Sequence, residues 1–83
     1  MKKEIKMYDT KRTNNEYEIC LAIDTGNNEE VVLGKANEEN YVTWLCVNGN
    51  DYYWGNYFNN LGDALFDFIE RAGIKQGKRE NEI

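Results

Sequence analysis

The side chains that most often carry chemistry are scarce in this 83-residue chain, which contains no histidine and no serine. Their absence removes the usual general base, the Ser–His nucleophile pair and the histidine-rich metal site. The two cysteines, Cys20 and Cys46, stand in apolar segments, without a metal-binding spacing. We expect two reduced, buried thiols that behave as small hydrophobes, and a disulfide only if adjacent strands bring them together.

Carboxylates are abundant, but their number alone does not define an acid/base pair. Glycosidase chemistry needs two carboxylates held about 5–9 Å apart in a cleft, and many pairs in this chain could meet that condition. Residues 24–30 (DTGNNEE) offer oxygen ligands but lack the alternating acids and the terminal glutamate of a calcium loop. We therefore expect no enzyme, no metal site and no cofactor.

The distribution of charge is more informative than the net charge of −5. From Thr13 to Glu70 there are eleven acids and one base, Lys35, which gives −10. Residues 1–12 contribute +3 and residues 71–83 contribute +2, so that −10 + 3 + 2 = −5. A body this acidic repels phosphate, so we expect no direct binding of nucleic acid.

Two interpretations of the acidic body remain open. The acids could serve only solubility. Alternatively, carboxylates spaced over a rigid surface could imitate a phosphate backbone and occupy a basic groove on a nucleic-acid-handling protein, because arginine and lysine bind both anions in the same way. The residues expected to bind such a partner are Asp24, Glu29, Glu30 and Asp51 at one end of a sheet, Glu38 and Glu39 at the other, and Tyr53 and Tyr57 as aromatic anchors.

The elements that must position these residues follow from the pattern of apolar side chains. Loose alternation over 2–12, clearer alternation over 17–24, and the segments 30–36 and 41–47 predict antiparallel strands with asparagine-rich turns between them. The strand over 41–47 has apolar residues on both faces and is expected inside the sheet or covered on both sides. In the strand over 17–24, strict alternation puts Tyr17, Ile19, Leu21 and Ile23 on one face. Gly34 indicates a bulge or a close backbone approach. The Asn-Gly pair at 48–49 is a strong hairpin signal and predicts a further strand after it.

One amphipathic helix is predicted after the strands. Asn60 is its N-cap, Asp63 lies near the positive end of the helix dipole, and Gly73 ends the helix. Asp67 and Arg71 are expected to pair on its outer side. Its apolar stripe consists of Leu61, Ala64, Leu65, Phe68, Ile69 and Ala72.

The predicted fold class is α+β: an antiparallel β-meander of four to five strands followed by one C-terminal helix packed on one face. Residues 1–74 would form a single domain and residues 75–83 a flexible polar tail. The chain shows no signal peptide and no apolar run of about 18 residues. We therefore expect a soluble cytoplasmic protein with no membrane partner.

The register of the last hairpin has two solutions. A two-residue turn places Trp44 beside Tyr53, whereas a three-residue loop with a bulge places it beside Trp54. We favour the second solution and a core role for both tryptophans. It gathers Val42, Trp44, Tyr52, Trp54 and Phe58 on one face. A single helix would then leave uncovered several of Tyr41, Leu45, Val47, Tyr53 and Tyr57, which suggests a partner surface or a homodimer.

One segment resembles a pattern in small proteins of Firmicutes phages and conjugative elements. It consists of residues 51–58 (DYYWGNYF) and the helix that follows them, which contains Leu61, Asp63 and Phe68. In that pattern an aromatic strand leads into a short acidic helix. In its small size, acidity and richness in asparagine, the chain also resembles anti-CRISPR proteins, many of which block the guide or target-DNA groove of an effector nuclease. This second resemblance is one of type and carries over no residues.

The resemblance implies an inhibitor of a basic nucleic-acid-handling protein, such as a CRISPR effector nuclease, in the cytoplasm of a bacterial host. The alternative is a dimerising structural or interaction module of a mobile element, with no mimicry of nucleic acid. A third hypothesis is a small-ligand sponge in which Trp44, Trp54 and Tyr53 stack on a nucleotide base. Phosphate recognition would require cations or a glycine-rich helix start, and neither is evident with these aromatic residues, which disfavours this third hypothesis.

Overall fold

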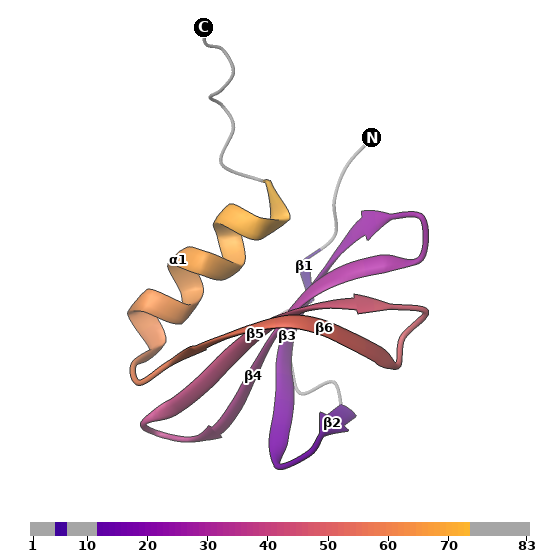
Figure 1. Cartoon of the computed structure of the whole chain (residues 1–83). Coiled ribbons are helices and arrows are strands. Elements are labelled where there is room, and N and C mark those ends of the chain that lie inside the picture. Colours follow the sequence, from indigo (N-terminus) through magenta and orange to yellow (C-terminus); the bar gives the residue numbers. More distant parts are fainter. Residues whose placement is uncertain (1–4, 7–11, 74–83) are drawn as a thin grey trace, which may run out of the picture.

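The computed structural model describes residues 5–6 and 12–73, so the predicted tail over 75–83 lies outside it. Figure 1 shows a strongly twisted antiparallel sheet with one helix on one side. The elements in chain order are β1 (Ile5–Lys6), β2 (Arg12–Asn14), β3 (Tyr17–Gly26), β4 (Glu29–Asn37), β5 (Asn40–Val47), β6 (Asp51–Phe58) and α1 (Leu61–Ala72).

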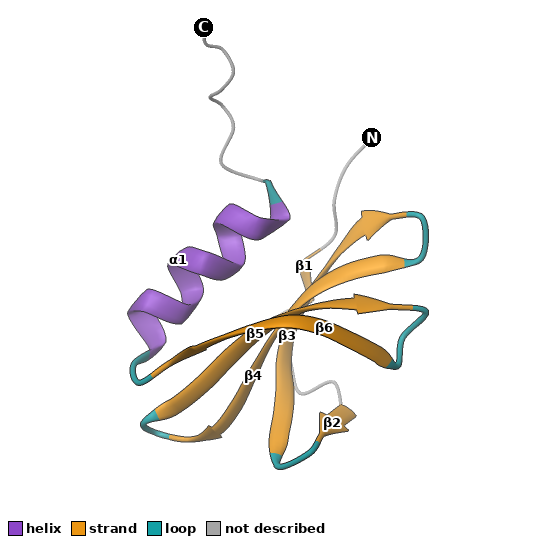
Figure 2. Cartoon of the chain, viewed as in Figure 1, coloured by secondary structure: helices purple, strands orange, loops and turns teal. Residues whose placement is uncertain are grey.

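The strand order is β1-β3-β4-β5-β6, and β2 also pairs with β3. Every pairing is antiparallel, and β3 to β6 follow one another as a meander. The region predicted as one N-terminal strand provides two short strands, because Ile5 pairs with Ile23 and Arg12 pairs with Ile19 on the same β3. The α+β prediction, a meander followed by one packed helix, is confirmed (Figure 2).

The helix begins and ends where its capping residues predict. The side-chain Oδ1 of Asn60 accepts a hydrogen bond from the N–H of Asp63 at 2.9 Å, which satisfies one of the free donors of the first turn. Gly73 has a left-handed backbone with φ of 72°, and its N–H donates to the carbonyl of Glu70 at 3.1 Å. The helix is therefore fixed in length at both ends by local interactions.

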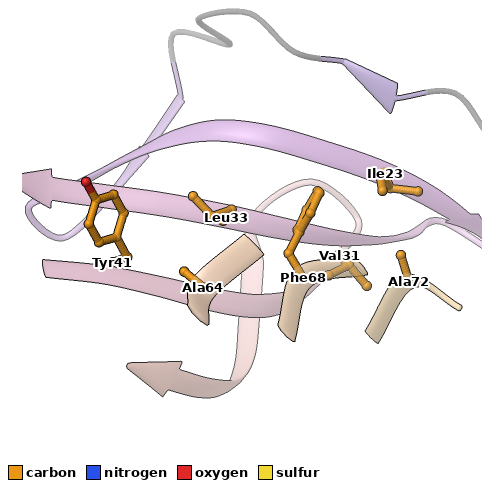
Figure 3. Packing of buried hydrophobic residues seen from close by; sticks show 7 residues of the cluster. All are labelled: Ile23, Val31, Leu33, Tyr41, Ala64, Phe68 and Ala72. Atoms are coloured by element: carbon orange, nitrogen blue, oxygen red, sulfur yellow. The ribbon is translucent and has the colours of Figure 1, made fainter. Parts of the chain in front are cut away.

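One hydrophobic cluster, the helix-side core, lies between α1 and the sheet. Phe68 and Ala64 face β4 and β5 from the helix, and all members of the cluster are at most 4% exposed. Figure 3 shows Phe68 pointing from the helix into this layer, between sheet residues. The cluster consists of Ile23, Val31, Leu33, Tyr41, Ala64, Phe68 and Ala72. The helix thus covers the face of Tyr41, which we had expected to be uncovered.

A second cluster, the concave-side core, fills the other face of the sheet. The ring of Tyr17 on β3 lies 5.6 Å from that of Trp44 on β5 and 6.2 Å from that of Tyr57 on β6. Since β4 separates β3 from β5, these contacts require a strongly curled sheet. On its concave face, side chains from strands that are not neighbours contact one another. The cluster consists of Ile19, Ala22, Val32, Val42, Trp44 and Cys46.

A β-bulge in β3 explains why the strict alternation predicted for this strand is wrong. Ile19 pairs opposite Gly34 but Leu21 pairs opposite Leu33, so one extra residue enters β3 between them. Leu21 then packs against the helix-side core, whereas Tyr17 and Ile19 belong to the concave side. A Cβ atom at Gly34 would lie 3.1 Å from Tyr17 Cβ, which confirms the close approach predicted at this glycine.

A second bulge interrupts β6. Val47 pairs opposite Asp51, so the three-residue loop that we favoured is present. Further along, Leu45 pairs opposite Tyr53 and Thr43 opposite Asn56, which leaves Trp44 facing the two residues Trp54 and Gly55. The expected gathering on one face is therefore wrong for Trp54, which is 75% exposed, and for Phe58, which packs on the helix-side core.

Candidate functional site

Every cation between residues 12 and 73 is engaged in an ion pair. The pairs are Arg12 Nη2 to Glu30 Oε1 at 2.8 Å, Lys35 Nζ to Glu38 Oε2 at 3.0 Å, and Arg71 Nε to Asp67 Oδ2 at 3.5 Å. Eleven acids stand against these three cations, so residues 12–73 carry 3 − 11 = −8. The surface of this part of the chain has no cation left to balance its remaining carboxylates.

Apart from Glu70 on α1, the acids outside these three pairs gather where the strands end, and these seven make no ion pair with another described residue. They are Glu16, Glu18, Asp24, Glu29, Glu39, Asp51 and Asp63. One group surrounds the β3–β4 and β5–β6 turns, which we call the linked-turn end (residues 24–30 and 47–51). The other surrounds the opposite end, the helix-start end (residues 15–18, 37–40 and 59–63). Figure 1 shows the two sets of turns at opposite ends of the strands.

Local hydrogen bonds hold the turns of both ends in place. At the linked-turn end, the N–H of Asn48 donates to the carbonyl of Asn28 at 2.8 Å and joins the two hairpins. At the helix-start end, Asn37 Oδ1 accepts from the N–H of Glu39 at 2.9 Å. The carboxylates are therefore carried on fixed backbone positions, so less conformational entropy is lost when a partner binds.

The predicted acids occupy the two ends as hairpin geometry requires, but they are not equivalent. Asp24, Glu39 and Asp51 are exposed, and Asp24 Oδ1 also accepts a hydrogen bond from the N–H of Gly26 at 2.8 Å. Glu38 is exposed and pairs with Lys35. The side chain of Glu30 is only 25% exposed and pairs with Arg12, so its charge is already compensated within the chain.

Arg12 lies in a small polar cluster at the linked-turn end, beside the concave-side core. Its Nη2 lies 2.8 Å from Glu30 Oε1 and 3.6 Å from Cys46 Sγ, and the hydrogen bond to Glu30 raises the pKa of Arg12 above its ordinary value. Burial raises the pKa of the Cys46 thiol and of the Tyr52 phenol. Both groups therefore stay protonated at neutral pH, and this thiol is not activated as a nucleophile.

Both cysteines are reduced thiols, as expected, but only one of them is fully buried. Cys46 is 0% exposed, whereas Cys20 is half-buried on β3. The two strands that carry them are separated by β4, so the arrangement that would allow a disulfide is not formed.

A shallow hollow lies at the linked-turn end and is lined by Arg12, Asp24, Asn28, Glu29, Glu30, Asn48 and Gly49.

Strand β6 forms one edge of the sheet and carries three exposed aromatic side chains. Tyr53 is 48% exposed, Trp54 75% and Tyr57 62%. A core role is confirmed for Trp44, which is 5% exposed, and is wrong for Trp54 because the bulge turns it out of the alternation. The Trp-Gly pair inside the strand was the available signal, because glycine within a strand often marks a bulge.

Polar contacts tie the helix to this edge. Asp67 Oδ2 accepts hydrogen bonds from Thr43 Oγ1 on β5 at 2.6 Å and from Asn56 Nδ2 on β6 at 3.2 Å. Arg71 pairs with Asp67 and donates to the carbonyl oxygen of Trp54. The predicted Asp67–Arg71 pair is present, but its expected position on the outer side is wrong, since both side chains face β5 and β6.

No protein-family model, no curated protein and no solved structure matches this chain. Within residues 5–6 and 12–73, no group of three or more acidic or cysteine side chains is placed to hold a metal ion. The one described helix is too short and too polar to cross a membrane. The physical features of the surface, its charge and its exposed aromatic edge, must therefore carry the functional argument.

Proposed function

We propose that this protein is a small acidic inhibitor that binds a basic groove on a nucleic-acid-handling protein, with a CRISPR effector nuclease as the candidate partner. The observation that carries the proposal is the charge balance of residues 12–73. All three cations are engaged by acids, while seven acids at the two ends of the sheet have no ion pair among the described residues.

Such a surface is unfavourable by itself and favourable against a cationic one. Like charges on one surface repel, and the arginine and lysine side chains of a basic groove relieve that repulsion. In the complex, these side chains bind the carboxylates of the inhibitor in place of the phosphates of the nucleic acid. Complementary fields also steer the encounter and raise the association rate at low salt. Because the turns that carry the acids are fixed by hydrogen bonds, the surface can present them in one arrangement.

The test is a target-DNA cleavage assay with a panel of purified, guide-RNA-loaded effector nucleases. The proposal predicts that the chain blocks at least one of them when added before the DNA, and blocks it much less when the DNA is already bound. Two matched double variants locate the contact: Glu29→Lys/Asp51→Lys at the linked-turn end and Glu38→Lys/Glu39→Lys at the helix-start end. If neither variant weakens inhibition, the proposed contact is wrong.

A dimerising interaction module is the second candidate, and the exposed aromatic edge favours it. Among the described strands, β6 pairs only with β5, and an edge strand can pair with a second chain. The charge of −8 over residues 12–73 opposes the close approach of two copies. Sedimentation velocity separates the two: a stable dimer that Tyr53→Glu abolishes supports this candidate, and a monodisperse monomer contradicts it.

A further inference from the structure

Trp54 has a left-handed backbone conformation that tryptophan rarely adopts. Eight described residues have a left-handed backbone with positive φ, and seven of them are asparagine or glycine, the residues that tolerate it best. Those seven are Asn15, Gly26, Asn27, Asn28, Asn48, Gly49 and Gly73. The eighth is Trp54, with φ of 54°. For a bulky side chain this conformation is strained.

The fold gains little from a tryptophan at this position. The side chain is 75% exposed, so its indole removes little apolar surface from water. The bulge itself depends on the next residue, because a Cβ atom at Gly55 would lie 2.7 Å from Trp44 Nε1. Arg71 binds the main-chain carbonyl of residue 54, which any residue would supply. The large exposed ring on a strained backbone therefore points to a role in binding.

We infer that Trp54 is the anchor of the partner interface and that its indole face receives an arginine or lysine side chain of the basic partner. This inference rests on the function proposed above and names the chemistry of the contact. Tryptophan provides the best aromatic face for a guanidinium or ammonium group, and tryptophan and tyrosine dominate the strongest positions of interfaces. Tyr53, 48% exposed beside it, extends the aromatic surface.

Charge complementarity selects this occupant over a second copy of the chain. Arg71, which reaches the backbone of Trp54, is itself paired with Asp67 and brings no uncompensated positive charge to the edge. A basic segment meets residues 12–73 with their charge of −8, whereas a second copy of the chain would bring its own net charge of −5 to the same edge. The edge therefore fits an arginine- or lysine-bearing segment.

The first test separates binding from folding. In Trp54→Asn the new residue tolerates the left-handed backbone, so the inference predicts a melting temperature equal to or above that of the wild type. A structural role for the indole predicts a clear drop instead and would overturn the inference. Ile69→Gln, at an apolar helix residue that is 38% exposed and lies outside both acidic ends, controls for the general loss of surface hydrophobicity.

The second test measures affinity for a labelled peptide of alternating arginine and glycine, by fluorescence anisotropy at low salt. Trp54→Asn should weaken binding by about tenfold, Trp54→Tyr should retain much of it, and Ile69→Gln should leave it unchanged. A glutamine-glycine peptide of equal length should not bind. If Trp54→Asn binds as tightly as the wild type while Glu29→Lys/Asp51→Lys binds less tightly, the anchor is wrong and the acidic function stands.

The failure of the proposed function would give a different result. If the wild type does not bind the arginine-glycine peptide, or if neither charge reversal weakens binding, the acidic mechanism fails and the anchor fails with it. A dimer in sedimentation velocity that Trp54→Asn dissociates would show that a second copy occupies this edge, which also overturns the inference.

Discussion

Asp67 joins three elements of the described structure, because its carboxylate contacts residues on β5, on β6 and on its own helix α1. Its Oδ2 accepts from the hydroxyl of Thr43, which is 0% exposed, and from the amide of Asn56, and it pairs with Arg71 on its own helix. A buried hydroxyl that loses its only acceptor retains the full cost of leaving water. Removing the Asp67 carboxylate should therefore cost more stability than removing the Thr43 hydroxyl.

We predict that Asp67→Ala lowers the free energy of unfolding by about 2 kcal/mol, because it leaves the Thr43 hydroxyl buried without its acceptor. Thr43→Val should cost less than about 1 kcal/mol, since it removes the hydroxyl and keeps the shape, while Asp67 retains Asn56 and Arg71. Urea denaturation measures both values. Equal effects, or a larger effect of Thr43→Val, would show that this hydrogen bond does not hold the helix to the sheet.

The buried Cys46 and Tyr52 make stability depend on alkaline pH. Burial raises both pKa values in the folded state from ordinary values of 9.0 and 10.0. Above those values the unfolded chain loses protons that the folded chain keeps, so stability falls as pH rises. The contribution is complete below about pH 9 and is lost progressively above it.

Urea denaturation between about pH 8 and about pH 11 should therefore show a falling free energy of unfolding, and Tyr52→Phe should make the fall shallower because one ionisable group is removed. A free energy that stays constant over this range, or a slope unchanged by Tyr52→Phe, would contradict the burial of these groups.

At the scale of the elements, the bulge in β6 requires a glycine at position 55. A Cβ atom at Gly55 would lie 2.7 Å from Trp44 Nε1 and 3.0 Å from Tyr57 Cε1, which forces the bulge or the concave-side core to move. Gly55→Ala should lower the free energy of unfolding by about 2 kcal/mol through overpacking.

Gly62→Ala is the control for this prediction. Its Cβ atom would lie 3.4 Å from Asn60 Oδ1, an ordinary contact, and alanine favours the helix by up to about 1 kcal/mol. Thermal melts should thus move in opposite directions for the two variants. Equal shifts would contradict the close approach at Gly55.

The sequence was sufficient for the elements and their order because their signals are local. Alternating apolar residues, the Asn-Gly turn at 48–49, the Asn60 cap and Gly73 each act within a few residues. The bulges in β3 and β6 could not be located in this way. A bulge is set by which residues face each other across strands, and at Trp54–Gly55 that choice depends on where the Trp44 indole packs.

For the whole molecule, the positions of the acids were predictable for the same topological reason. In a meander the turns lie at the two ends of the sheet, and most of the acids stand in or beside turns. The neutralisation of Glu30 was not predictable, because Arg12 reaches it from outside the β3–β6 meander. The exposure of Trp54 was missed for a different reason: an aromatic residue in a strand is usually assigned to the core, and the bulge signal of Gly55 was not used.

The scale of the whole molecule is also where the functional proposal belongs, because no single carboxylate defines it. Seven acids divided between two ends can contact a groove together, each with a small contribution. Loss of one acid should therefore weaken binding slightly, and loss of a whole end should weaken it strongly. The effects of the two double charge reversals should add when the ends act independently.

The most direct test of this account is the affinity of the chain for an effector nuclease that it inhibits, measured from about 50 mM to about 300 mM NaCl, where the screening length falls steadily. The account predicts that affinity drops at least about tenfold over this range and that Glu38→Lys/Glu39→Lys or Glu29→Lys/Asp51→Lys flattens the dependence. An affinity that does not change with salt, or a panel of nucleases in which none is bound, would contradict it.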